Sequence, residues 1–366
     1  MALSTGIVGL PNVGKSTLFN ALTKAGNAQA ANYPFCTIEP NKATVAVPDK
    51  RIDELTALVK PRKTIYAAAD FIDIAGLVAG AHRGEGLGNQ FLGNIRECAA
   101  LIHVVRCFED ENVSHVYGEI DPVRDIETIE TELVLADLQS VEKRLEKLRR
   151  QAKASRDLQA PAEMLENLLA HLNEGREARL FTVPDDEHCR QIWQEMGLLS
   201  AKPVIYCANV DEKSLAGKNC LAEKTAARAR AKNAGFVQVC ARLEEELQEL
   251  DPAEQAELLA SYGLKESSLE HIAQKAYNIL GLQSFFTAGP DEVRAWTIKR
   301  GSKAPQAAGV IHSDFERGFI RAETVSYGDF MKYRSEAACR NAGVLRTEGR
   351  DYIVKDGDIM HFLFNV

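Results

Sequence analysis

The feature that most constrains this chain is the stretch Gly-Leu-Pro-Asn-Val-Gly-Lys-Ser-Thr at residues 9–17. It matches the pattern GxxxxGK[ST], in which a glycine-rich loop turns its backbone N–H groups toward phosphate oxygens. The apolar residues 6–8 before it predict a buried strand, and residues 16–22 after it predict an amphipathic helix. Because the motif requires this strand–loop–helix context, we interpret it as a nucleoside triphosphate site in an α/β fold.

The residue types in this loop indicate individual roles. Lys15 would bring positive charge to the β- and γ-phosphates, and it counts as catalytic because phosphoryl transfer to water depends on charge neutralisation. Ser16 would offer its hydroxyl oxygen to Mg²⁺. We expect six consecutive residues to bind the nucleotide: Asn12, Val13, Gly14, Lys15, Ser16 and Thr17.

Two elements further along would complete the Mg²⁺ and γ-phosphate sites. Thr37 lies in an irregular, proline-containing stretch, where Ras-like G proteins place a threonine that completes the Mg²⁺ shell. The apolar residues 67–74 predict a strand that ends in a DxxG pattern. Asp73 of this pattern would hold an Mg²⁺-bound water, and the N–H of Gly76 would meet the γ-phosphate as part of the catalytic machinery. The combination predicts a nucleoside triphosphatase with switch loops.

Leu77 stands where many G proteins place a glutamine that orients the attacking water. A leucine side chain has no hydrogen-bonding group, so another group must position the water. Residues 78–90 are rich in glycine, which predicts a mobile second switch.

A base-recognition element is expected after the next buried strand, at residues 202–209. The sequence Asn209-Val210-Asp211-Glu212 has the order of the guanine-binding NKxD element, with Val210 in place of the lysine and Glu212 in place of the final aspartate. Both changes remove guanine selectivity, and neither creates adenine selectivity by itself. We expect Asn209, Val210 and Glu212 to bind the base.

The hydrophobic period changes between the two halves of the α/β pattern. Apolar residues recur at alternating spacings of 4 and 3 from Val134 to Leu148, and a second apolar face runs from Met164 to Leu172. This pattern predicts an antiparallel helical hairpin inserted in the α/β domain. Residues 143–156 carry seven Lys or Arg against one Glu, which fits either a solvated charged face or contact with RNA phosphates.

The last part of the chain predicts a small α+β domain. Residues 293–298 and 318–325 are expected strands, and residues 352–354 and 359–364 predict a hairpin joined by an Asp-Gly turn. The expected division is therefore a first part of the G domain at 1–125, an inserted helical domain at 126–200, a second part of the G domain at 201–281, and a C-terminal domain at 282–366.

Composition bounds the class of protein. The 366 residues are 45% hydrophobic and 26% charged, as in a globular protein of several domains. The net charge of -8 argues against a chain coated in nucleic acid, although it allows a local basic patch. No apolar run of about 18 residues predicts a membrane span. The eight cysteines have no CxxC spacing and no signal peptide is visible, so we expect a reduced, cytoplasmic protein.

Together these residues resemble the YchF, or Obg-like ATPase, family of P-loop NTPases. The resemblance implies a G domain interrupted by a helical hairpin and followed by a TGS domain, which is a β-grasp module. It also implies that Asn12 matches a loop asparagine that holds K⁺ in K⁺-stimulated relatives, and that His115 matches a histidine proposed to replace the missing glutamine. The matching stretches are residues 9–17, 32–41, 73–88, 209–212, 286–289, 292–297 and 351–366.

The resemblance further implies hydrolysis of ATP in preference to GTP, with Mg²⁺, by a switch protein that associates with the ribosome. It implies that backbone groups near Asn209 and Val210 read adenine. We expect contact with the 50S subunit or its RNA through the basic helical hairpin. Two alternatives stay open: a GTP-driven switch, and an RNA- or ribosome-docking protein whose nucleotide only sets its conformation. For His115, which would be catalytic if it positions water, the alternative is a solvent-facing loop histidine.

Overall fold

The computed structural model describes residues 3–30, 41–74, 87–153, 155–215 and 217–365. The chain divides into two compact units, each discontinuous in sequence. The first unit comprises Met1–Ala21, Pro40–Lys42 and Phe71–Ser268, and the second comprises Leu22–Glu39, Ala43–Asp70 and Leu269–Val366. Residues 43–70 therefore group with the C-terminal part of the chain.

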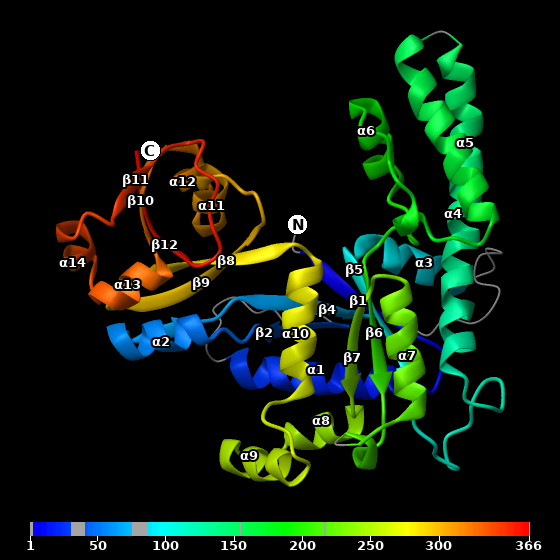
Figure 1. Ribbon diagram of the computed structural model, residues 1–366, viewed down its shortest axis with the longest axis horizontal. Coiled ribbons are helices and arrows are strands. Elements are labelled where there is room, and N and C mark those ends of the chain that lie inside the picture. The colour runs from blue at the N-terminus through cyan, green and yellow to red at the C-terminus, as the bar shows by residue number, and fades with distance from the viewer. Residues whose placement is uncertain (1–2, 31–40, 75–86, 154, 216, 366) are drawn as a thin grey trace. The chain divides into compact units, whose positions relative to one another are not determined.

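The first sheet has six strands in the order β2-β4-β1-β5-β6-β7 (Figure 1). Strands β1, β5, β6 and β7 run parallel, so their carboxyl ends meet at one edge, where open α/β sheets bind their ligands. Every residue of β1 and β5 is buried, as in a parallel sheet covered on both faces. The strands are β1 Ser4–Val8, β2 Lys42–Ala46, β4 Ala68–Asp73, β5 Ala100–Arg106, β6 Val204–Asn209 and β7 Gly235–Val239.

Helices follow the strands of this sheet along the chain, as the alternating α/β pattern predicts. Each of α7 and α9 begins at a side-chain cap, with Asn219 accepting the N–H of Ala222 and Asp251 forming a capping box with Glu254. The helices are α1 Lys15–Ala30, α3 Leu87–Glu97, α7 Cys220–Ala231, α8 Ala241–Leu247 and α9 Pro252–Ser261. The next helix, α10 Ser268–Ile279, belongs to the second unit from Leu269 on.

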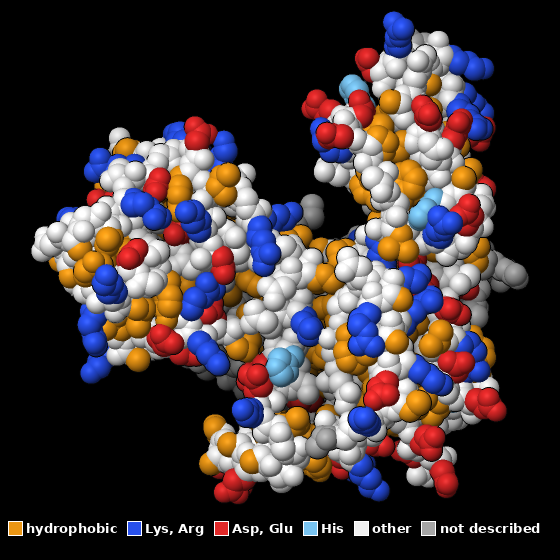
Figure 2. Space-filling view, viewed as in Figure 1, with side chains coloured by type: hydrophobic (Ala, Val, Ile, Leu, Met, Phe, Trp, Pro, Cys, Tyr) orange, Lys and Arg blue, Asp and Glu red, His pale blue; other side chains and the backbone are white. Residues whose placement is uncertain are grey.

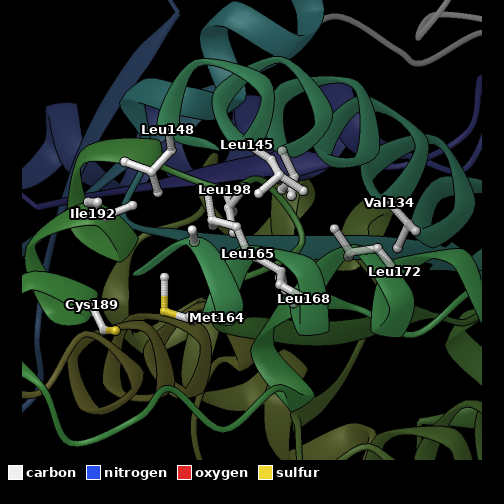
Figure 3. Close-up of a cluster of buried hydrophobic side chains, with 13 residues drawn as sticks. Val134, Leu145, Leu148, Met164, Leu165, Leu168, Leu172, Cys189, Ile192 and Leu198 are labelled. Atoms are coloured by element: carbon white, nitrogen blue, oxygen red, sulfur yellow. The ribbon is translucent and has the colours of Figure 1, made fainter. Parts of the chain in front are cut away.

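A helical arm interrupts the first sheet between β5 and β6, which confirms the predicted hairpin (Figure 1). It consists of α4 Pro122–Ala152 and α5 Gln159–Asn173, joined through a short 3-10 turn, with α6 Glu187–Met196 packed against α5. Asp121 caps α4 by accepting two backbone N–H groups, and proline occupies its first turn. The seam between the helices is apolar and buried (Figure 3), formed by residues that include Val134, Val141, Leu145, Leu148, Leu165 and Leu168.

The second unit contains a mixed sheet in the order β11-β10-β12-β8-β9-β3. The central strand β12 is antiparallel to β10 and parallel to β8, and its apolar face packs with α11 around Phe285, Phe319 and Phe362. The strands are β3 Lys63–Ile65, β8 Leu282–Ala288, β9 Glu292–Lys299, β10 Phe319–Ser326, β11 Arg346–Glu348 and β12 Asp358–Phe364. The helices are α2 Lys50–Val59, α11 Ala304–Ile311, α12 Ser313–Arg317, α13 Tyr327–Tyr333 and α14 Glu336–Asn341. This architecture confirms the predicted C-terminal α+β domain.

The hairpin predicted between residues 352–354 and 359–364 is wrong. Ile353 makes an isolated bridge with Lys303, while β12 pairs with β10 and β8. Gly357 adopts a φ of +87° and donates its N–H to the carbonyl of Ser284 at 2.8 Å, so the Asp-Gly pair leads into a central strand. A local alternation of apolar residues indicates a strand but cannot identify its partner.

None of the helices in the described ranges combines the length and apolar character that crossing a membrane requires. The seven cysteines within these ranges carry free thiols, and all but Cys220 are buried. Burial raises the pKa of the Cys207 and Cys240 thiols, as expected for small core residues.

Candidate nucleotide-binding site

Residues 9–14 form a tight loop between β1 and α1. Gly14 has a φ of +93°, and a Cβ atom there would lie 2.2 Å from Nδ2 of Asn209. A Cβ atom at Gly9 would lie 2.5 Å from the carbonyl oxygen of Val104. Only glycine fits both places, so the chain can curl closely enough for its N–H groups to converge on phosphate.

Asn209, the last residue of β6, braces two loops at this edge of the sheet. Its Nδ2 donates to the carbonyl of Val13 at 2.9 Å, and its Oδ1 accepts the N–H of Ala241 at 3.0 Å. The side chain is buried, so without it the carbonyl of Val13 and the N–H of Ala241 would each lose a hydrogen bond that water could not replace. The structure thus gives Asn209 a bracing role, beyond the base contact that the sequence predicts.

Lys15 is the first residue of α1, and its side chain is buried against the loop. The ammonium donates to the carbonyl of Leu10 at 2.7 Å, and burial lowers the pKa of Lys15 to about 8 despite the attraction of Asp73. Among the described residues, Lys15 forms no salt bridge. A bound phosphate would supply the missing negative charge and favour the protonated form.

Ser16 and Asp73 are the described part of the expected Mg²⁺ site. Ser16 is exposed at the start of α1, and Asp73 ends β4, where its N–H donates to the carbonyl of Asn41 at 3.0 Å. Burial raises the pKa of the Asp73 carboxyl, because no neighbouring cation fully compensates its charge. A hydroxyl and an under-compensated carboxylate are hard oxygen donors that suit Mg²⁺. Thr37, Gly76 and Leu77 lie outside the described residues.

The base-recognition element lies at the end of β6, next to the phosphate loop. Val210 is buried, and its N–H donates to the carbonyl of Val239 at 2.8 Å. The carbonyl of Asn209 accepts the N–H of Cys107 at 2.8 Å. The backbone donor of Val210 is therefore not available to N1 of adenine, which corrects part of the expectation that nearby backbone groups read the base.

Glu212 has a cationic neighbour that the sequence reasoning missed. The Nε atom of Arg242, on α8, lies 3.8 Å from a carboxylate oxygen of Glu212. Asp211 instead caps the short turn at Glu212–Ser214, accepting the N–H of Ser214 at 2.8 Å. Arg242 comes just after the last strand of the sheet, in the loop that contacts the base in G proteins. This position is the only sequence signal that could have identified Arg242 as a neighbour of Glu212.

The side chain of His115 does not face solvent, because only 2% of it is exposed. Its Nε2 lies 2.8 Å from a carboxylate oxygen of Asp125, and its Nδ1 accepts the N–H of Tyr117 at 3.2 Å. Asp125 lies in the first turn of α4. Both ring nitrogens are thus occupied, and His115 would have to leave at least one partner to orient water.

Arg106, at the end of β5, holds the loop that leads to His115. Its guanidinium is buried and donates to the carbonyls of Phe108 at 3.2 Å, Val113 at 2.9 Å and Asp110 at 3.3 Å. This loop meets the phosphate loop where Nδ2 of Asn12 donates to the carbonyl of Ser114 at 3.3 Å. Sequence reasoning missed Arg106, because one basic residue in an apolar strand gives no sign of its partners.

A glycine-rich loop between a buried parallel strand and a helix, with a lysine at the helix start and an aspartate ending a nearby strand, defines a P-loop NTPase. Two family models match the chain. One, described as 50S ribosome-binding GTPase, matches residues 4–137, and the other, YchF-GTPase_C, described as a protein of unknown function, matches residues 282–365.

Similar proteins cover the chain from end to end. It is 50% identical over 369 residues to the ribosome-binding ATPase YchF of Bacillus subtilis, and 49% identical over 367 residues to that of Escherichia coli O157:H7. Each match covers 100% of this chain and 100% of the relative. A solved structure of the Schizosaccharomyces pombe YchF GTPase is 40% identical and superposes with a TM-score of 0.88, over 99% of this chain and 97% of that one. The chain belongs to the YchF family, as its sequence motifs indicated.

Proposed function

We propose that this protein is a ribosome-associated, Mg²⁺-dependent ATPase of the cytoplasm that acts as a nucleotide-dependent switch. The observation that carries the proposal is the buried ammonium of Lys15, which lies in a complete phosphate loop near Asp73 and lacks a counter-ion among the described residues. Full-length relatives that are about 50% identical and bear the name ribosome-binding ATPase support the choice of nucleotide and partner.

Ser16 and Asp73 would hold Mg²⁺, with Thr37 completing the set. The cation would neutralise charge on the β- and γ-phosphates. Lys15 and the loop N–H groups would do the same from the other side, and the N–H of Gly76 would meet the γ-phosphate. No protein nucleophile is needed for this reaction. Asn12, oriented by its bond to Ser114, would be the ligand for K⁺.

GTP would lose its advantage because two changes disable the element that binds guanine in G proteins, and the preference for ATP would come from other groups that read adenine. Val210 brings no amine to brace the loop, and its side chain is buried in the protein core. The Glu212 carboxylate lies 3.8 Å from Nε of Arg242, which also pairs with Glu246 at 3.2 Å, so a cation stands near the carboxylate that a guanine edge would need. Asn209 holds the loop in place. The groups that read adenine would be groups other than the N–H of Val210, which is already bonded to Val239.

The helical arm would provide the contact with the 50S subunit or its RNA. Arg144, Arg149 and Arg150 form salt bridges with glutamates, so part of the basic charge is compensated within the arm. Lys143 and Lys147 are exposed and form no salt bridge among the described residues. Figure 2 shows acidic and basic side chains interspersed over the arm, with basic ones at its outer end. The domain limits 1–125, 126–200, 201–281 and 282–366 are part of this proposal.

Steady-state hydrolysis of ATP and GTP, measured with and without purified 70S ribosomes, tests the proposal. We expect turnover of ATP by the protein alone and cosedimentation with ribosomes that differs between ATP and ADP. Cosedimentation without any turnover would favour the docking protein whose nucleotide only sets its conformation. Turnover of GTP alone would favour the GTPase switch.

A further inference from the structure

The second unit contains a cavity of about 370 Å³ that the nucleotide site does not use. Its lining residues fall between Thr287 and Phe364, on β8, β9, β10 and β12 and the helices beside them. The cavity is large enough for several side chains of a ligand. Its position in the sheet and the chemistry of its walls indicate what kind of ligand it suits.

The cavity lies where β8 and β12 stop pairing. On one side, β12 pairs with β10 along its whole length, from Asp358 to Phe364. On the other side, its pairing with β8 is confined to Ile359, opposite Phe286. Residues 287–289 of the β8–β9 connection and residues 360–362 of β12 line the cavity beyond that point. β12 lies between β10 and β8, so within the described chain only its part after Ile359 lacks a registered partner on the β8 side and faces the cavity. Unpaired strand backbone of this kind can pair with another strand.

The cavity walls are mostly aromatic and aliphatic, with an acidic rim. Trp296, Phe315 and Phe362 contribute rings. The charged lining residues in this described part of the chain are Glu292, Glu323 and Glu336, with neither Lys nor Arg among them. Such a surface favours a ligand that is apolar in part and positively charged in part.

Arg340 compensates this acidic rim only in part. It forms salt bridges with Glu323 at 2.9 Å and with Glu336 at 3.2 Å, while its own side chain stays 60% exposed. Glu292 has Arg294 at 4.0 Å, and the guanidinium of Arg294 stacks on the ring of Trp296 at 3.8 Å. The glutamates are thus held in place at the rim, and a basic ligand can still reach them.

We propose that this cavity binds an extended segment of a partner protein in which Lys or Arg alternates with apolar residues. The segment pairs with the backbone of β12 after Ile359, where the registered pairing with β8 has ended, and this satisfies backbone groups of both chains. Because side chains alternate along a strand, apolar ones enter the cavity while basic ones meet Glu292 and Glu336. RNA is disfavoured, since the lining carries carboxylates and no cation to neutralise phosphates.

The test uses the full-length protein and a pool of blocked heptapeptides in which Lys alternates with Val, Leu or Phe. Binding is followed by calorimetry and by amide chemical shifts. A matched pool carries N-methyl groups on alternate backbone amides, which removes hydrogen-bond donors and keeps charge and apolar surface. Ala288→Arg puts a long side chain on the cavity lining, and Glu292→Lys reverses one charge of the lining. Glu163→Lys, at an exposed site on α5, is the control with the same charge change as Glu292→Lys.

We expect the peptide pool to bind, the N-methylated pool to bind at least about tenfold more weakly, and both cavity variants to weaken binding about tenfold. ATP hydrolysis should be unchanged in all three variants. No binding at millimolar peptide, equal binding of both pools, or equal loss in Glu163→Lys would overturn the proposal. So would polyuridylate RNA that binds in place of the peptides and is lost in Ala288→Arg. If Ala288→Arg does not fold, Glu292→Lys decides alone.

Discussion

Replacing Arg106 by lysine should lower both the unfolding free energy of the first unit and the catalytic rate. The buried guanidinium donates to three backbone carbonyls of the loop at 108–113, and an ammonium at the end of the shorter side chain can satisfy about one of them. Two lost bonds from a charged donor, at about 1–2 kcal/mol each, predict a loss of about 2–4 kcal/mol in the unfolding free energy of this unit.

The rate should fall because this loop continues into Ser114 and His115, beside the phosphate loop. A displacement of about 1 Å near reacting groups can lower a rate about a hundredfold, so we expect kcat for ATP to fall at least about tenfold. The affinity for nucleotide should change less than about threefold, because the phosphate-binding residues themselves stay in place.

Urea unfolding measures the loss of stability, and single-turnover hydrolysis measures the loss of kcat. Equilibrium binding of a fluorescent ATP analogue measures the nucleotide affinity. Arg144→Lys is the control, since Arg144 lies on the helical arm and pairs with Glu195 at 2.9 Å. If Arg106→Lys matches the wild type in both stability and kcat, the loop does not depend on this guanidinium. A loss of affinity as large as the loss of kcat would show that Arg106 acts on nucleotide binding instead.

Three further variants test other parts of the account. Lys15→Ala should abolish hydrolysis and strongly weaken triphosphate binding without unfolding the chain, as circular dichroism and nucleotide titration would show; wild-type turnover would contradict the assigned site. Replacing Lys143, Lys147 and Arg150 by Glu should weaken ribosome or RNA binding and flatten its salt dependence, with ATPase activity of the protein alone unchanged; if affinity and salt slope both survive, these residues form a solvated face. His115→Ala should lower kcat with little change in nucleotide affinity, and an unchanged kcat would remove it from the catalytic residues.

The sequence was enough to predict features that local spacing determines. The phosphate loop needs glycines, a lysine and a hydroxyl at fixed intervals, and the structure places Gly14 where a Cβ atom cannot fit. The alternating spacing of 4 and 3 predicted the arm, whose seam residues Val141, Leu145 and Leu148 are buried. In both cases the signal is the spacing of residue types within one segment, even though the partner of Gly14, Asn209, is distant in sequence.

Features that depend on distant partners could not be predicted in this way. Residues 43–70 join the second unit through the parallel pairing of β3 with β9, more than two hundred residues away. The bracing role of Asn209 depends on Val13 and Ala241, and that of Arg106 depends on carbonyls whose positions only the folded loop defines. A side chain's type shows what it can bond, whereas its partners follow from the tertiary fold.

Competition between unlabelled ATP and GTP for one labelled analogue tests the central claim most directly. The account predicts a lower dissociation constant for ATP, because Val210 replaces the bracing lysine and the Glu212 carboxylate, with Arg242 3.8 Å away, is a poorer acceptor for the two donors of guanine than the aspartate of NKxD. It also predicts that the double change Glu212→Asp with Val210→Lys moves the preference toward GTP. Tighter binding of GTP to the wild-type protein would contradict the ATPase assignment and favour a GTP-driven switch.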